Sequence, residues 1–202
     1  ITAVSPTYAQ ELRYSFFAHG MESVIQRNAG KVYGVLNGID MDRYDPSKGE
    51  GIQYKFSAKS MAGKAKNKAY LQKQMGLAEN PDVPVIGIVS RLVSHKGLDL
   101  IQKVFDQIMD LHCQFVVLGS GDWNYEQFFE QKRGQYEGRM GLFRGYNEEL
   151  ANAIYAGADL LLMPSKSEPC GLAQMIAMRY GTVPIVRETG GLKDTVHPYE
   201  AW

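Results

Sequence analysis

Two basic side chains stand close together in a segment that could bind an anion. Arg91 follows an apolar run at 84–90, and Lys96 precedes an amphipathic stretch. An arginine fork can hold two phosphate oxygens at once, whereas a lysine acts as a point charge. Fixed cations that face a departing diphosphate stabilise the negative charge it gains as the bond to it breaks. The local sequence leaves open the alternative of two surface charges at the start of a helix.

A carboxylate occurs in a second candidate loop. Glu168 lies between a predicted strand and a predicted helix. There it could accept hydrogen bonds from sugar hydroxyls and offset positive charge that develops on a sugar ring. The alternative is a carboxylate that the dipole of the following helix favours. We interpret Cys170 as a small packed residue rather than a nucleophile, because no histidine lies in its local motif.

Glycine-rich turns and one aromatic residue complete the candidates. Thr189-Gly190-Gly191 follows the last predicted strand, and backbone N–H groups at such a turn bind phosphate well. Gly119-Ser120-Gly121 is a weaker case and is not a dinucleotide-binding GxGxxG. Tyr146 could stack on a purine face. A tight turn for the glycines and core packing for the tyrosine are the alternatives.

From Pro84 onward, short β-rich runs alternate with helical periods. We expect strands at 84–90, 114–118, 142–144, 159–163 and 183–186, and helices at 98–108, 125–133, 148–156 and 171–180. This alternation is typical of an α/β domain with a doubly wound, Rossmann-like parallel sheet. Ligands of such sheets bind beyond the carboxyl ends of the strands. The loops that should therefore line one crevice begin at Ser90, Gly119, Gly145, Pro164 and Glu188.

The first 80 residues follow a different pattern. We expect a helix at 9–17 that is entered through Pro6, and a strand at 32–36 that ends in a turn at Asn37-Gly38. Residues 47–73 carry seven lysines. An anion-binding patch is one interpretation of this run. We favour a solvated helix face, because Glu50 and the alanines suit an exposed helix.

Composition excludes several classes of function. Lys plus Arg number 22, as do Asp plus Glu, so the net charge is zero and does not favour nucleic acid or an anionic membrane. No apolar run approaches the roughly 20 residues of a transmembrane helix, and no basic leader is visible. The two cysteines form no CxxC pattern, which argues against a zinc site and fits a reducing compartment.

Six blocks of the chain together resemble the bacterial glycogen synthase and plant starch synthase family of retaining glucosyltransferases. They are VSPTY at 4–8, LNGID at 36–40, SRL with KG at 90–97, GY at 145–146, S with EPCGL at 165–172, and TGGL with DTV at 189–196. Each block alone is only suggestive. Their order and spacing make the resemblance specific.

The resemblance implies roles for the three charged candidates. Arg91 and Lys96 would hold the diphosphate of the donor, and Glu168 would be the essential carboxylate near the donor sugar. One departure separates close relatives. The wider family usually has a second Glu eight positions after the first, where this chain has Ile176, and often has Phe where Cys170 stands. Both differences favour the glycogen and starch branch.

The resemblance also implies the remaining donor-binding set. Tyr146 would stack on adenine, and Asn37 resembles a hinge residue that reaches the donor. The Thr-Gly-Gly turn would give backbone donors to the phosphates and glucose. The other implied contacts come from Cys170, Gly171 and Leu172 of the EPCGL block, and the turn itself is Thr189, Gly190 and Gly191.

The implied reaction transfers glucose from ADP-glucose to the non-reducing end of an α-1,4-glucan and retains the anomeric configuration. The expected partners are ADP-glucose or ADP and the glucan acceptor, with no nucleic acid and no membrane. No metal and no further cofactor is expected, because the two cations take over the role of a metal. The expected location is the cytoplasm of a bacterium, or the plastid of a plant.

Enzymes of this family have two facing α/β domains, the GT-B architecture. We expect residues 1–30 to be a remnant of the N-terminal domain with the hinge. Residues 31–202 should be the C-terminal nucleotide-sugar-binding domain, truncated before its final crossover helix. The Lys-Thr-Gly-Gly-Leu loop and the active-site His of the first domain are not in this sequence. We therefore expect the chain to bind ADP or ADP-glucose weakly and to transfer no glucose alone.

Two other functions remain open on the sequence. One is a related retaining transferase of the same architecture that uses a UDP-sugar and a non-glucan acceptor. The other is a non-catalytic module that binds a nucleotide or a glucan. The presence of Arg91, Lys96 and Glu168 together weighs against the second, because a degenerate binder does not need all three.

Overall fold

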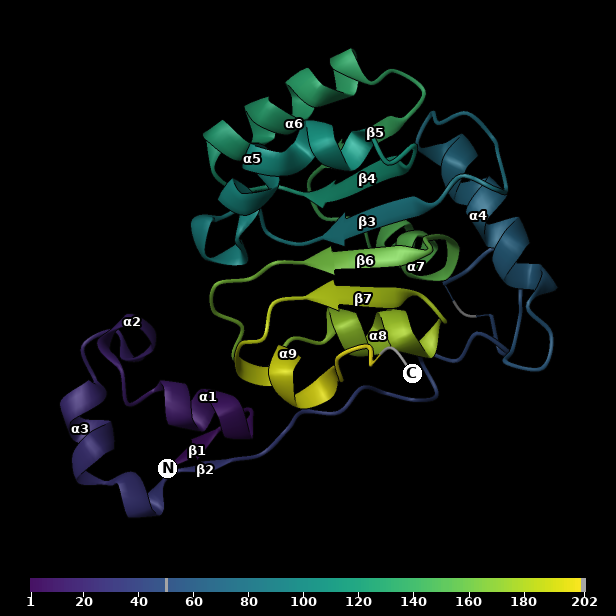
Figure 1. Ribbon diagram of the computed structural model, residues 1–202. Coiled ribbons are helices and arrows are strands. Elements are labelled where there is room, and N and C mark those ends of the chain that lie inside the picture. The colour runs from purple at the N-terminus through teal and green to yellow at the C-terminus, as the bar shows by residue number, and fades with distance from the viewer. Residues whose placement is uncertain (50, 201–202) are drawn as a thin grey trace.

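The computed structural model describes residues 1–49 and 51–200. Within them, the central sheet has five parallel strands in the order β5-β4-β3-β6-β7 (Figure 1). The strands are β3 (Val85–Val89), β4 (Gln114–Gly119), β5 (Met140–Arg144), β6 (Leu160–Met163) and β7 (Val183–Val186). The predicted parallel, Rossmann-like α/β sheet is confirmed. Glu50, part of the argument about the lysine-rich run, lies outside the described residues, as does the end of the predicted domain at 201–202.

One face of the sheet is covered by α5 (Leu98–Met109) and α6 (Trp123–Gln135). The buried positions of α5 recur every three or four residues, so they form one apolar stripe; they are Leu98, Ile101, Phe105 and Met109. Phe105 packs edge-on against Phe115 of β4 and Phe128 of α6. Burial of this stripe fixes the helix that follows Lys96.

The opposite face is covered by α7 (Glu148–Gly157) and α8 (Ala173–Arg179), and α4 (Ala62–Gln74) packs against α7 at the amino-terminal ends of the strands (Figure 1). Residues of these helices share one core cluster with inward-facing residues of β3, β4 and β6. Because both faces of the centre of the sheet are covered, the two central strands β3 and β6 are apolar along their whole length. No helix of the described residues is both long and apolar enough to cross a membrane.

The sheet has a switch point between β3 and β6. Strand β3 pairs with β4 on one side and with β6 on the other. The chain leaves β3 toward α5 on one face, and it leaves β6 toward α8 on the other. The two loops therefore diverge beyond the carboxyl ends of the strands, which is where open α/β sheets bind their ligands.

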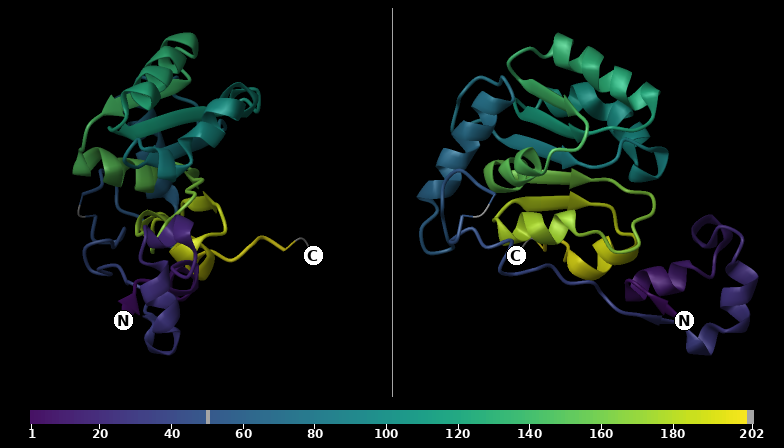
Figure 2. Two further views of the ribbon diagram at one scale, coloured as in Figure 1. Left: turned by 90° about the vertical axis from the view of Figure 1, so that its left-hand side faces the viewer. Right: turned by 180° about the vertical axis from the view of Figure 1, so that it is seen from behind.

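Residues 1–34 form a small unit beside the β7 side of the sheet (Figure 2). It contains β1 (Thr2–Ala3) paired in parallel with β2 (Tyr33–Gly34), and the helices α1 (Pro6–Glu11), α2 (Ser15–Ala18), α3 (Glu22–Arg27) and η1 (Ala29–Lys31). The pairing of β1 with β2 thus extends this N-terminal unit to Gly34. The domain boundary after residue 30 stays a prediction.

Three expectations about this N-terminal part are wrong in detail. The helix at 9–17 is split, because Tyr14 is extended and separates α1 from α2. The strand at 32–36 is only two residues long, since β1 offers two residues for pairing. Asn37-Gly38 forms no turn, and the chain continues as a linker along the β7 side to α4 (Figure 1).

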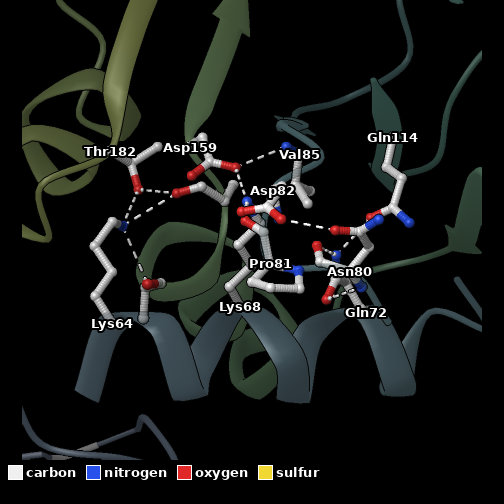
Figure 3. Close-up of polar contacts among 12 residues, drawn as sticks. Lys64, Lys68, Gln72, Asn80, Pro81, Asp82, Val85, Gln114, Asp159 and Thr182 are labelled. Carbon is white, nitrogen blue, oxygen red and sulfur yellow. Dashed lines mark hydrogen bonds and ion pairs between the residues drawn. The ribbon is translucent and has the colours of Figure 1, made fainter. Parts of the chain in front are cut away.

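The lysine-rich helix α4 is not simply a solvated face. Lys64 is mostly buried and donates to the carbonyl oxygens of Ala156 and Ala158 and to Oγ1 of Thr182 (Figure 3). Lys68 lies 2.8 Å from Oδ2 of Asp159. These two lysines tie the helix to the amino-terminal side of the sheet. Neither interpretation of this run anticipated that role.

Candidate functional site

A cavity of about 200 Å³ opens between β3 and β6, at the switch point. Its lining comes from the loops that follow these two strands and from the start of α8. Its polar and glycine lining residues are Ser90, Arg91, Lys96, Ser165, Glu168 and Gly171. Of the five loops predicted to line one crevice, those beginning at Ser90 and Pro164 line this cavity, whereas those beginning at Gly119, Gly145 and Glu188 contribute none of its lining residues. All three charged residues predicted to do chemistry line this cavity.

The loop after β3 is held rigidly from within. Leu92 is fully buried, and its backbone N–H donates to the carbonyl of Ser120 at 2.9 Å. Gly97, with a φ of +73°, ends η2 (Ser94–Lys96) and approaches the carbonyl of Pro164 so closely that a Cβ would overlap it. Only glycine combines this φ with this contact. The loops after β3 and β6 therefore meet backbone to backbone.

Lys96 and Glu168 form an ion pair inside the cavity lining. Nζ of Lys96 lies 2.6 Å from Oε2 of Glu168, and Ser165 donates from Oγ to the same oxygen at 3.0 Å. The carboxylate is buried and its partner is mostly so. A buried carboxylate needs such partners, because desolvation disfavours an unpaired charge. The carboxylate is held in place by a cation and a hydroxyl group.

Arg91 differs from Lys96 in its surroundings. Its side chain is exposed, and no described residue forms an ion pair with its guanidinium group. It lines the cavity at the switch point and also a second cavity of about 210 Å³ that faces the N-terminal unit. Tyr8 and His19 of that unit line the second cavity. Arg91 is therefore free to contact a ligand that enters from either side.

His95 also faces the second cavity. Burial lowers the pKa of its imidazole, and the positive charges of Lys96 and Arg91 lower it further. A histidine whose pKa is lowered below its usual value of about 6.5 stays neutral at pH 7.

The loop after Glu168 differs from its prediction. The helix begins at Ala173 rather than at 171, because Gly171 has a φ of +76° and Leu172 is the N-cap residue. Cys170 is buried with a free thiol, as expected for a packed residue. Gly171 and Leu172 both line the cavity at the switch point.

The Thr-Gly-Gly turn opens α9 (Gly190–Thr195), with Thr189 as N-cap. Its donors have partners within the chain. Thr189 Oγ1 and the N–H of Gly190 donate to Glu11, and the N–H of Gly191 donates to the carbonyl of Glu168. The turn thus touches the Glu168 loop, although none of its residues lines the cavity at the switch point. Its donation to phosphates stays a prediction.

Tyr146 and Asn37 lie apart from the charged group. Tyr146 follows β5 and is 85% exposed, which excludes the alternative of core packing. Its neighbour Gly145 donates from its N–H to the carbonyl of Gly119, so the loops after β4 and β5 are adjacent. Asn37 is exposed on the linker, and neither residue lines the cavity at the switch point. Their contacts with a ligand stay predictions.

Sequence reasoning missed the contacts of α1 with this region. Thr7 donates from its N–H and its Oγ1 to the carboxylate of Asp194, at 2.8 and 2.6 Å. Ser5 donates to the carbonyl of Pro169 at 2.6 Å. All four residues belong to the blocks that carry the family resemblance. The presence of such blocks at both ends of the chain was the signal in the sequence from which a contact between these segments could have been inferred.

Comparison with known proteins places this chain in a family. The family model "Glycosyl transferases group 1" matches residues 71–201, well over half of the chain. Glycogen synthase of Bacillus cereus (strain B4264) is 50% identical over 200 residues, which cover 99% of this chain and 42% of that protein. Glycogen synthase of Geobacillus thermodenitrificans (strain NG80-2) is 49% identical over 98% of this chain and 41% of its own length.

A solved structure gives the same result for the fold. The catalytic domain of starch synthase IV from Arabidopsis thaliana, bound to ADP and acarbose, superposes with a TM-score of 0.92 at 42% identity. The match covers 99% of this chain and 41% of that one. The chain therefore spans less than half the length of the curated relatives it matches, and corresponds to the C-terminal domain of the GT-B fold. By its sequence and its fold, the chain belongs to the group 1 family of glycosyl transferases.

Proposed function

We propose that this chain is the nucleotide-sugar-binding half of a glycogen or starch synthase. The complete enzyme would transfer glucose from ADP-glucose to the non-reducing end of an α-1,4-glucan, with retention. The observation that carries the proposal is the placement of Arg91, Lys96 and Glu168 around one cavity at the switch point. The likeness to glycogen synthases and to a starch synthase bound to ADP and acarbose supports it.

The cations would stabilise the leaving diphosphate. Arg91 is exposed with an unpaired guanidinium fork among the described residues, which suits a bidentate contact with phosphate oxygens. Lys96 is held at the cavity by Glu168, so its charge needs little reorganisation when the leaving group becomes more negative. We expect these two charges to do the work of a metal ion and expect turnover to survive chelation.

Glu168 would act beside the sugar of the donor. It is the one carboxylate among the described residues that line the two cavities. Double displacement with retention needs a carboxylate nucleophile in addition to an acid. Glu168 is already engaged by Lys96 and Ser165, so its arrangement favours an electrostatic role. We therefore favour departure and attack on one face of the sugar, with the diphosphate as the base.

The other half of the site would come from a facing domain. The chain spans 42% of the B. cereus relative, and Arg91, Lys96 and Glu168 line a cavity that opens toward the N-terminal unit. The partners proposed are therefore ADP-glucose, the glucan acceptor and the N-terminal domain of the same enzyme. In a bacterium we expect the enzyme in the cytoplasm.

Calorimetry with ADP and UDP, together with a glucan elongation assay, tests the proposal. The 202-residue chain should bind ADP more tightly than UDP and should elongate no glucan, whereas the full-length enzyme should elongate glucan from ADP-glucose. Preference for UDP would favour a UDP-sugar transferase. Nucleotide binding without transfer by the full-length protein would favour a binding module. Elongation by the isolated chain would refute the proposed division of the active site.

A further inference from the structure

Helix α1 contacts the Glu168 loop and the start of α9 at the same time (Figure 1). Ser5, at the N-cap of α1, is fully buried and donates to the carbonyl of Pro169 at 2.6 Å. Glu11, the last residue of α1, reaches the Thr-Gly-Gly turn. The six-residue helix is therefore fixed at both ends to loops of the candidate site, more than 160 positions away in the sequence.

One oxygen of Glu11 receives two hydrogen bonds. Thr189 Oγ1 donates to Oε1 at 2.8 Å, and the backbone N–H of Gly190 donates to the same atom at 3.0 Å. The other oxygen, Oε2, is buried and has no hydrogen-bond partner among the described residues. A carboxylate that receives a backbone N–H and a hydroxyl fixes the direction of both donors. Glu11 thus fixes the position of the first residues of α9.

The start of α9 in turn touches Glu168 without an intervening side chain. The N–H of Gly191 donates to the carbonyl of Glu168 at 3.0 Å. A Cβ at Gly190 would overlap that same carbonyl oxygen, and a Cβ at Gly191 would overlap the backbone of Cys170. With two backbones in such close contact, a displacement of the turn displaces the Glu168 loop.

We propose that Glu11 is a positioning residue for Glu168. It acts through the Thr189-Gly190 turn and the hydrogen bond from Gly191 to the carbonyl of Glu168. The carboxylate of Glu168 is then aimed at Lys96 across the cavity. This inference rests on the proposed function, in which Glu168 acts beside the donor sugar. It adds a side chain from the N-terminal unit to the set that determines turnover.

Thr7 offers a matched control on the same helix. It makes two hydrogen bonds of comparable length to Asp194 of α9, but among the described residues Asp194 forms no hydrogen bond or ion pair with the Glu168 loop. Loss of either contact weakens the packing of α1 on α9. Only loss of the Glu11 contact releases the turn that touches Glu168.

The experiment compares Glu11→Ala, Glu11→Gln and Thr7→Val in the full-length enzyme. Glu11→Ala should lower kcat by about 10- to 100-fold and leave KM for ADP-glucose within about threefold, because the substrate still binds but its reacting geometry is lost. Glu11→Gln keeps an acceptor oxygen and should restore kcat to within about fivefold of wild type. Thr7→Val loses only the hydrogen bond from Oγ1 to Asp194 and keeps the one from the backbone N–H, so it should keep kcat within about twofold and lower Tm no more than Glu11→Ala does. Equal loss of kcat in Glu11→Ala and Thr7→Val would overturn the inference.

Amide hydrogen exchange separates this inference from the proposed function, because it needs no substrate. Exchange at Gly190 and Gly191 should accelerate in Glu11→Ala and stay near wild type in Glu11→Gln and Thr7→Val. Unchanged exchange in Glu11→Ala would overturn the positioning role even if the wild-type enzyme elongates glucan. Failure of the wild-type enzyme to use ADP-glucose would instead refute the proposed function, and accelerated exchange would still support the route from Glu11 to Glu168.

Discussion

Nζ of Lys96 lies 2.6 Å from Oε2 of Glu168, and the two side chains are 18% and 9% exposed. The sequence suggested separate tasks for them, one at a diphosphate and one at a sugar. Their direct contact means that each orients the other. Breaking such a pair leaves one charge buried without a partner, which is costly, although the intact pair contributes little net stability.

Replacing one member of this pair should therefore destabilise the protein strongly, and the losses in the two single variants should add up to more than the loss in the double variant. We expect Lys96→Ala and Glu168→Ala each to lower the free energy of unfolding by about 2–3 kcal/mol, and the double variant to lose less than the sum. Urea denaturation of all four proteins gives the coupling energy. The Lys166–Asp99 pair, 2.7 Å apart but 32% and 35% exposed, is the control, with coupling below about 1 kcal/mol. Equal coupling in the two pairs would contradict the prediction.

Arg91 should behave in the opposite way, because it is exposed and unpaired among the described residues. Arg91→Ala should change the free energy of unfolding by less than about 0.5 kcal/mol. In the full-length enzyme it should lower turnover by about 100-fold or more, since a cation aimed at the leaving group is lost. Steady-state kinetics of glucan elongation measures this.

Arg187→Ala is the control for Arg91→Ala. Arg187 is exposed and follows β7, but it lines neither cavity near the switch point. Its substitution should leave turnover within about twofold of wild type. Near-normal turnover in both Arg91→Ala and Lys96→Ala would refute the assignment of these residues to the diphosphate.

Tyr146 should contribute to nucleotide affinity through its ring alone. Stacking of a base on an aromatic side chain is worth about 1–3 kcal/mol, so Tyr146→Ala should raise the Kd for ADP by about tenfold. Tyr146→Phe should stay within about twofold. Tyr199→Ala, at a side chain that is 90% exposed, is the control and should leave the Kd unchanged. Calorimetry measures the Kd of each variant. An unchanged Kd in Tyr146→Ala would show that Tyr146 does not contact the nucleotide.

The parts of the fold that local patterns determine could be predicted from the sequence. The apolar stripe of α5 and the β-branched run of β3 are properties of consecutive residues. Element ends depend on neighbours that the sequence does not reveal. Strand β5 begins at Met140 rather than 142, because Met140 and Gly141 pair with Phe115 and Val116 of β4. The positive φ of Gly171 likewise delays the start of α8.

Part of the candidate site could also be predicted from the sequence. Arg91, Lys96 and Glu168 follow parallel strands, and the carboxyl ends of such strands share one edge, so their meeting follows from the fold class. The role of Glu11 does not, because its partners lie 178 and 179 positions away and no local pattern reports them. Lys64 is similar, since its acceptors Ala156 and Thr182 are 92 and 118 positions distant.

Gly190 should tolerate no side chain. Its φ is +44°, and a Cβ would overlap the carbonyl oxygen of Glu168. Gly190→Ala should therefore destabilise the protein by about 1–3 kcal/mol and reduce turnover of the full-length enzyme. Gly134 is the control, because it lies within α6 and a Cβ there meets nothing within 4 Å. Gly134→Ala should stabilise by about 0.5–1 kcal/mol in thermal denaturation, since alanine favours helix. Destabilisation by both would contradict the steric argument.

Lys64 should make the free energy of unfolding depend on pH in the alkaline range. Burial lowers the pKa of its ammonium group from 10.5 to about 8. Below pH 8 the group is charged in both the folded and the unfolded chain, and the folded state bears the cost of its desolvation. Between about pH 8 and 10.5 the unfolded chain binds more protons at this site, so the contribution of Lys64 to the free energy of unfolding rises with pH.

Comparison of wild type with Lys64→Met isolates this effect, because the other titrating groups cancel in the difference. From pH 7.5 to pH 10, wild type should gain stability relative to Lys64→Met, by at most about 3 kcal/mol. Urea denaturation at both pH values measures the difference. Lys66→Met, at an exposed lysine of the same helix, should show no such gain. A loss of relative stability in wild type as pH rises would mean that hydrogen bonds from the charged ammonium to Ala156, Ala158 and Thr182 outweigh its desolvation.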